Sequence, residues 1–332
     1  MTKLERIKDA AGAERWFALA SKCVPIDHPG LVAGSLEELL HQLRGEQRSA
    51  RYAHFVAVEE GVDVAYGTVR LPLRDNLSNA TVSFSVLPSR RSQGIGTDFA
   101  TEILTFIRSE DRTSAVWTVS SPVSEESPGC AFSRALGARR VLSRLRRELD
   151  LTMVDERKLD TLVKTKIDGH DRDYEIVTWV DRAPDHLVEG VAQLVGRMST
   201  DTPRGDPSWE SEVWDASRWR EKEDDASHSG RGRFAAGAVD RSGHLVAFTD
   251  IGVWKQEPGV AEQWNTIVDS KHRGHRLGLA AKVANLRNLR REVPGALRLE
   301  TWNANENTRM IAINELLGFQ IVECVDEFQL AL

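Results

Sequence analysis

The sequence is poor in cysteine and lacks long apolar runs. Three cysteines occur in 332 residues, Cys23, Cys130 and Cys324, and none has the close spacing of a metal-binding pair. A sparse, odd set is typical of a reducing cytoplasm, and we expect no metal site. No uninterrupted apolar stretch approaches the length that spans a bilayer, so we expect no membrane partner.

An excess of positive charge is also absent. The formal net charge is −6, which argues against a nucleic-acid partner. The first ten residues, M-T-K-L-E-R-I-K-D-A, are charged and have no apolar core, so we do not expect a signal peptide. The chain is long enough for two globular domains, and we expect a cytoplasmic protein.

Two stretches of the chain resemble each other. Val268–Ala281 reads V-D-S-K-H-R-G-H-R-L-G-L-A-A, and Val86–Ala100 reads V-L-P-S-R-R-S-Q-G-I-G-T-D-F-A. Arg91 aligns with Arg273 and Gly96 with Gly278 at an offset of 182 residues, and two later Leu-Gly landmarks keep an offset of 181. We infer an internal duplication of a whole domain, with a period too long for a solenoid repeat.

The apolar patterns predict the same elements in each half: strand, helices, strands, helix, strand, helix, strand. This is an α+β fold, with a mixed, mostly antiparallel sheet flanked by helices in each domain. We expect an N-terminal domain at 1–152, a linker at 153–172 and a C-terminal domain at 173–332. The second half departs from the first over Met198–Arg233, and we expect a loop at Ser199–Asp225 within it.

Each repeated stretch predicts a strand, a basic Gly-containing turn and a helix. A helix that begins this way presents free backbone N–H groups, which attract phosphate. In the second copy Arg273, His275 and Arg276 add side-chain donors. Such a turn would also fit a plain strand–helix connection.

These turns resemble the acetyl-CoA loop of the Gcn5-related N-acetyltransferase superfamily, Arg/Gln-x-x-Gly-x-Gly/Ala. The first copy matches in full with Arg91, Gly94 and Gly96, whereas the second has Arg276 in place of the first glycine. The family's later motif is an Asn, a Tyr seven residues on, and then Leu-Gly-Phe. The second copy has Asn307 and Leu317–Phe319, but Asn314 replaces the Tyr.

The first copy has Glu126 and Ser133 at those Asn and Tyr positions. The resemblance covers nearly the whole chain as two tandem domains. The chain is similar to the two-domain actinobacterial acetyltransferases, the group that includes mycothiol synthase.

The resemblance implies an acyl-CoA-dependent N-acyltransferase that moves an acetyl group from acetyl-CoA directly to an amine. It also implies the residues that would contact the cofactor: Ile267, Val268, Arg273, Gly274, His275, Arg276, Leu277, Gly278, Asn303 and Asn307 in the second half, and Val86, Arg91, Gln93, Gly94, Ile95 and Gly96 in the first.

The C-terminal half is favoured as catalytic because it keeps Asn307, which in the family bonds the cofactor or an ordered water. Glu262 is the expected base, since the family often places its base near that strand position. Glu300 and Asp250 are alternatives on neighbouring strands, and Glu262 also fits a solvated carboxylate at a strand end. No thiolate acid is assigned, because neither half has the usual Tyr.

The acidic stretch 199–225 favours a small, cationic amine as acceptor, with Asp206, Trp209 and Asp250 as expected contacts. It would equally fit a solvated acidic surface, and its tryptophans would equally anchor the segment. Two other functions stay open: a non-catalytic acyl-CoA-binding protein and a protein or peptide N-acetyltransferase. The tandem arrangement fits a monomer or a homodimer.

Overall fold

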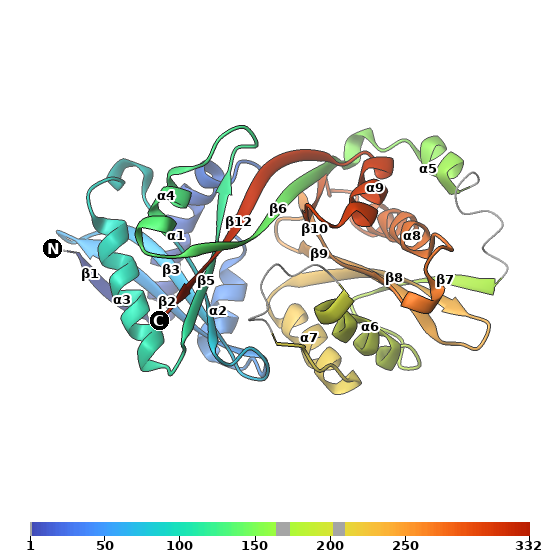
Figure 1. Cartoon of the computed structure of the whole chain (residues 1–332), viewed down its shortest axis with the longest axis horizontal. Helices are drawn as coiled ribbons and strands as arrows, with labels where there is room; N and C mark the ends of the chain where they lie inside the picture. The colour runs from blue at the N-terminus through green and yellow to red at the C-terminus, as the bar shows by residue number, and fades with distance from the viewer. Residues whose placement is uncertain (1, 164–172, 202–209) are drawn as a thin grey trace. The chain divides into compact units, whose positions relative to one another are not determined.

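The computed structural model describes residues 2–163, 173–201 and 210–332 (Figure 1). Its contacts divide the chain into two compact units. Among the residues described, unit 1 contains those up to Ser143 together with Glu323–Leu332, and unit 2 contains those between Arg144 and Val322. No helix in the described chain combines the length and the apolarity needed to cross a bilayer.

Unit 1 is built on one mixed sheet. Its strands lie in the order β1 (Lys3–Ile7), β2 (Ala50–Glu59), β3 (Val62–Pro72), β4 (Asn79–Val86) and β5 (Ser114–Ser121), followed by β12 (Gln320–Ala331) and β6 (Arg139–Asp150). The helices α3 (Ile95–Ser109) and α4 (Pro128–Ala135) pack on one face, and α1 (Ala10–Asp27) packs on the other, beside α2 (Leu36–Arg44). Side chains alternate along β2, so Phe55 joins the α3 core and Val56 joins the α1 core.

Unit 2 repeats this plan. Its strands are β7 (Tyr174–Val180), β8 (Arg231–Asp240), β9 (Leu245–Trp254), β10 (Val260–Val268) and β11 (Arg298–Ala304), in the order β6-β11-β10-β9-β8-β7. The helix α8 (Leu277–Glu292) packs on one face, while α6 (Val188–Asp201) and α7 (Ala216–His228) pack on the other. Two shorter helices, α5 (Glu156–Leu162) and α9 (Thr308–Leu317), complete the unit. The predicted α+β class is confirmed.

The final strands of the two sequence halves are exchanged. Residues 144–150 of β6 pair antiparallel with β11 in unit 2. Residues 324–331 of β12 pair antiparallel with β5 in unit 1. The chain therefore passes from unit 1 to unit 2 within β6 and returns to unit 1 within β12.

The expected loop at 199–225 is wrong in its second part. Residues 216–228 form α7, capped by Asp215, whose side chain accepts from Arg218 N. The apolar pattern is weak because Trp219 and Glu223 are its buried residues.

Candidate active site

The strands that flank the helix α8 diverge. β10 and β11 pair in parallel at Val260–Glu262 and Arg298–Glu300, and their described residues pair no further along. In unit 1, β4 and β5 pair in the same way at Asn79–Thr81 and Ser114–Val116. Each divergence leaves the backbone of β10 or β4 beyond the pairs open toward its parallel neighbour.

The turn after each diverging strand has the same backbone. A one-turn helix, η1 (Pro88–Arg90) or η5 (Ser270–His272), opens it. Two left-handed residues follow, Ser92 (φ 60°) and Gly94 (φ 83°) in unit 1, and Gly274 (φ 92°) and Arg276 (φ 57°) in unit 2. At the second of these positions, Arg276 adopts the left-handed backbone conformation for which glycine is better suited.

The arginine that both turns share forms a hydrogen bond with the last residue of the preceding strand. Arg91 Nε donates to Val86 O at 3.0 Å, and Arg273 Nε donates to Val268 O at 3.3 Å. In unit 1 Arg91 also pairs with Asp27 at 2.6 Å. Gln93 accepts a hydrogen bond from Arg90, so this side chain also stabilises the turn.

The turns present open helix N-termini. Arg276 O accepts from Leu279 N and Ala280 N, so the N–H groups at the start of α8 point out of the first turn. Leu277 and Ile95, the first residues of α8 and α3, are buried. A Cβ at Gly94 or Gly274 would meet no atom within 4 Å. These features fit a pyrophosphate group, as the acetyl-CoA loop requires.

The side chains that lie beside the first turns of α3 and α8 differ in size. In unit 1 a Cβ on Gly96 would lie 3.7 Å from Phe132, and the Phe84 and Phe132 rings lie 5.9 Å apart. In unit 2 a Cβ on Gly278 would lie 3.6 Å from Ile313 and 4.0 Å from Thr266, at the corresponding positions. In unit 2, Ile313 and Thr266 therefore replace the two phenylalanines of unit 1 with smaller side chains.

β10 carries a bulge that β4 does not. One extra residue lies between Gln263 and Thr266 opposite β9, whereas β3 and β4 pair continuously from Ala65–Val86 to Arg70–Thr81. Asp250 holds the bulge, because its Oδ1 accepts from Asn265 N at 2.9 Å and from Asn265 Nδ2 at 2.8 Å. Bulges re-aim backbone and side chains next to active sites.

A buried lysine supports the same bulge from the α8 side. Lys282 Nζ donates to Gln263 Oε1 at 3.1 Å, and Gln263 Nε2 donates to Asp250 O and Asn265 O. Burial lowers the pKa of Lys282 to about 7. The sequence motifs do not include this residue, although a lysine between Leu279, Val283 and Leu286 on an apolar helix face is a recognisable signal.

Glu262 and Glu300 form the last pair before β10 and β11 diverge. Ala261 and Leu299 beside them join the α8 core, so both carboxylates lie on the opposite face, toward α6 and α7. Glu262 is held by Arg231 at 2.8 Å and by Trp264 Nε1 at 3.1 Å.

Glu300 has a different environment. It is fully buried, and Arg146 Nη1 on β6 donates to its Oε1 at 3.0 Å, while Oε2 has no partner among the described residues. Burial raises the pKa of Glu300 to about 7, although Arg146 acts in the opposite direction. A carboxyl group with this pKa exchanges a proton readily at neutral pH.

The asparagines of the later motif lie around α9. Asn307 caps the helix, since its Oδ1 accepts from Met310 N at 3.3 Å. Asn314, in the Tyr position, is fully buried and donates to Asn303 Oδ1 at 2.7 Å. The motif thus links α9 to β11 beside the open strand.

A stack of alternating indoles and cations covers the sheet face toward α7, and we call it the Trp–cation ladder. Arg231 lies 3.6 Å from the Trp254 ring and 5.5 Å from Trp264. Arg233 lies 4.8 Å from Trp264 and 4.7 Å from Trp219.

The ladder continues along α7. Lys222 Nζ lies 5.5 Å from the Trp219 ring and 5.1 Å from Trp214, and Arg218 lies 4.3 Å from Trp214. Each contact is a cation–π interaction. Four of the nine tryptophans in the chain therefore gather on this face, which adjoins Glu262 and the bulge.

Of the expected acceptor contacts, Asp206 and Trp209 lie outside the described residues. Asp250 is fully buried, and its second oxygen accepts from Arg233 Nη1 at 2.7 Å. The structure thus brings Asp250 together with the bulge and the Trp–cation ladder, where its carboxylate is already engaged.

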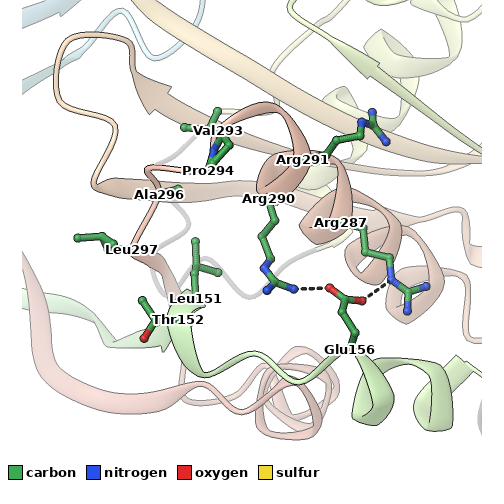
Figure 2. A pocket seen from close by; sticks show the side chains of 10 residues that line it. All are labelled: Leu151, Thr152, Glu156, Arg287, Arg290, Arg291, Val293, Pro294, Ala296 and Leu297. Carbon is green, nitrogen blue, oxygen red and sulfur yellow. Dashed lines mark hydrogen bonds and ion pairs between the residues drawn. The ribbon is translucent and has the colours of Figure 1, made fainter.

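A separate cavity of about 610 Å³ lies at the C-terminal end of α8 (Figure 2). Arg287, Arg290 and Arg291 line it, and Glu156 on α5 pairs with the first two of these. A helix of 16 residues is roughly 24 Å long, so this cavity is remote from the turn that begins α8. We assign no part of the candidate site to it.

Solved structures, and not sequence families, are similar to this chain. No family model matches the chain, and no curated protein matches it. A tandem GNAT protein from the clavulanic acid biosynthesis pathway, solved without acetyl-CoA, superimposes with a TM-score of 0.83 and 25% identity, over 100% of this chain and 98% of that one.

More distant structures share the fold alone. A GCN5-related N-acetyltransferase from Sphaerobacter thermophilus has a TM-score of 0.63 and 17% identity, over 99% of this chain and 95% of its own. Saccharomyces cerevisiae N-myristoyltransferase with bound myristoyl-CoA has a TM-score of 0.58 and 11% identity, over 99% and 79%. The chain is therefore a tandem protein of the Gcn5-related N-acetyltransferase fold, and its structural neighbours are acyltransferases.

Proposed function

We propose that the protein is an acyl-CoA-dependent N-acetyltransferase that acetylates the amine of a small molecule, and that unit 2 performs the transfer. One observation carries the proposal. In unit 2, the open edge of β10 leads from the last parallel pair, where a buried carboxyl group of raised pKa lies, toward the turn that begins α8.

Acetyl-CoA would supply the thioester whose acyl group is transferred. The backbone N–H groups at Leu277 and Gly278 would hold its pyrophosphate, with donors from Arg273, His275 and Arg276. Ile267 and Val268 would offer the open edge of β10 to the pantetheine arm. Asn303 and Asn307 would line the far side, from β11 and α9.

Glu300 is the better candidate for the base in this proposal. A base works best when its pKa lies near the working pH, and Glu300 meets this condition with one oxygen unpartnered. It would take the proton from the acceptor ammonium directly or through one water. Glu262 would then hold Arg231 in the Trp–cation ladder, although its place beside Glu300 keeps it as the alternative base.

Unit 1 has a turn that also fits a cofactor, through Val86, Arg91, Gln93, Gly94, Ile95 and Gly96. Thr81 and Val116, however, occupy the register positions of Glu262 and Glu300. The Phe84 and Phe132 rings also occupy the space beside Gly96, at the start of α3. We therefore propose that unit 1 does not catalyse transfer, whether or not it binds acetyl-CoA.

A matched pair of variants tests the proposal. Acetyl-CoA binding would be measured by calorimetry, and free thiol release would be measured with a panel of small amines, for wild type, Gly278→Trp and Gly96→Trp. We expect Gly278→Trp to abolish thiol release, because an indole would fill the space between Val268 and Ile313. Gly96→Trp should leave it intact.

Each other outcome points elsewhere. Loss of thiol release in Gly96→Trp alone would move catalysis to unit 1. Acetyl-CoA binding without thiol release from any amine would favour a non-catalytic acyl-CoA-binding protein. Absence of both would remove the enzyme hypothesis.

A further inference from the structure

The cations of the Trp–cation ladder differ in how their charge is balanced. Arg231 pairs with Glu262 at 2.8 Å, and Arg233 pairs with Asp250 at 2.7 Å. Lys222 Nζ, between them and Arg218, forms no hydrogen bond or ion pair with any residue that the structure describes. Its contacts are the faces of Trp214 and Trp219.

The surroundings of Lys222 disfavour an unbalanced ammonium. Burial lowers its pKa to about 8, and repulsion from Arg233 adds to the effect against attraction from Asp250 and Glu212. The group still carries its proton for most of the time at pH 7. A ligand anion at this position would relieve both the desolvation and the repulsion.

The neighbouring carboxylates are already engaged. Glu223 accepts from Ala183 N at 2.8 Å, from Trp219 Nε1 at 2.7 Å and from Arg220 Nη1 at 2.7 Å. Glu212 accepts from Trp214 Nε1 at 2.9 Å, and Asp224 pairs with Arg182. The acidity of this stretch is therefore largely internal, which weakens the sequence-based expectation of a cationic acceptor.

Lys222 is also placed on the face that leads to the reacting centre. It shares the Trp219 indole with Arg233, and Arg233 bonds the same Asp250 that holds the β10 bulge. Glu262 and Glu300 lie on this face of the sheet as well. The Trp–cation ladder thus runs along this face from Glu262, the partner of Glu300 in the last parallel pair, to Lys222.

We propose that Lys222 binds the carboxylate of the acceptor, so that the substrate class is an amine that carries a carboxylate, such as an amino acid or a derivative of one. The inference rests on the proposed N-acetyltransferase function. Trp214 and Trp219 flank the carboxylate and exclude water from the ion pair. Lys222 acts in recognition and takes no part in the chemical step.

The experiment compares a panel of free amino acids with the matching panel of amino-acid amides. Each would be assayed with acetyl-CoA by thiol release, for wild type, Lys222→Met, Lys222→Arg and the control Lys158→Met on the exposed surface of α5. We expect wild type to prefer the acids by at least about 10-fold in kcat/KM, as for a charge-assisted hydrogen bond. Lys222→Met should remove this preference, mainly by raising KM for the acids. Lys222→Arg should retain part of it.

A second readout does not depend on turnover. Thermal stabilisation by the same acids and amides, without acetyl-CoA, should favour the acids in wild type and Lys158→Met, but not in Lys222→Met. If amides are used as well as acids, or if Lys222→Met keeps the preference, the inference is overturned while the N-acetyltransferase function stands. It is also overturned if neither panel is turned over or stabilises the protein. Stabilisation by acids that depends on Lys222, without turnover of either panel, would support the inference and count against the proposed function.

Discussion

The two units share a backbone and differ in what they place on it. Both have a strand that diverges after three parallel pairs and a turn with two left-handed residues. Unit 2 adds a bulge, a pair of carboxylates and small side chains beside the open strand. Unit 1 has Thr81, Val116 and the Phe84–Phe132 contact at these places. A duplicated scaffold can therefore keep its shape while the side chains beside its open strand change from one copy to the other.

The largest expected effect tests the carboxylate pair that distinguishes unit 2. Glu300→Gln should lower kcat/KM for N-acetylation by about 100-fold or more, because general base catalysis typically contributes 10²- to 10⁴-fold. Its fold should survive, since the amide keeps the shape and removes a buried charge. Steady-state thiol release across pH 6–9 is the measurement. A larger loss in Glu262→Gln than in Glu300→Gln would reverse the assignment of the base.

The second prediction concerns His54, a buried histidine on β2 of unit 1. The corresponding position on β8 of unit 2 is Ala235. His54 is 1% exposed, and burial lowers its pKa to about 4. The unfolded state binds a proton below its ordinary pKa of about 6.5, whereas the folded state does not. Folding stability is therefore lost as the pH falls from about 6.5 toward 4, by at most roughly 3 kcal/mol.

Urea denaturation from pH 7 to pH 4 measures this loss. His54→Phe should flatten the dependence, and the exposed control His244→Asn should retain it. An unchanged slope in His54→Phe would show that other groups carry the acid sensitivity.

The third prediction tests the exchanged strand. Asp326 on β12 is 3% exposed and accepts from Ser143 Oγ and from Arg140 Nη1, the latter at 3.2 Å. Asp326→Asn should lower the free energy of unfolding by about 1–3 kcal/mol, because a buried charge-assisted pair is lost. Hydrogen exchange should speed up in β5, with the exposed Gln320→Asn as control. Faster exchange confined to unit 2 would contradict the prediction.

The smallest expected effect concerns the turn itself. Arg276 adopts a left-handed conformation (φ 57°) where unit 1 has Gly94 (φ 83°). Arg276→Gly should raise stability by up to about 1 kcal/mol by relieving backbone strain. Gly94→Arg should lower it by a similar amount. Thermal melts test stability, and calorimetry with acetyl-CoA shows whether the Arg276 side chain also contributes to binding. Destabilisation by Arg276→Gly would show that its side chain stabilises more than its backbone costs.

Much of this organisation could be predicted from the sequence, because it is local. The offset of 182 residues between Arg91 and Arg273 corresponds to matching turns, matching left-handed positions and matching Arg–backbone hydrogen bonds. The helix α7 was missed because its inward face is formed by an indole and a carboxylate, and not by an apolar stripe.

The remaining features depend on contacts between distant residues. The final strands of the two halves, β6 and β12, pair with β11 and β5, whose residues are distant from them in the chain, so these pairings are not set by neighbouring residues. The environment of Glu300 depends on Arg146, which lies 154 positions away in the chain. The sequence supplied Glu300 as an alternative, but its burial could not be read from its neighbours.

The strand exchange also has an evolutionary consequence. Two tandem domains that exchange no strand can be separated again by a single break in the gene. Each product can then evolve alone. Here a break after β6 would leave the first product without β12 and carrying a strand that belongs to the other fold. Once the exchange was established, loss of either copy would have removed a strand from the survivor. The first half of the sequence, which lacks the carboxylate pair, thus contributes a strand to the sheet of unit 2, whatever its own chemistry.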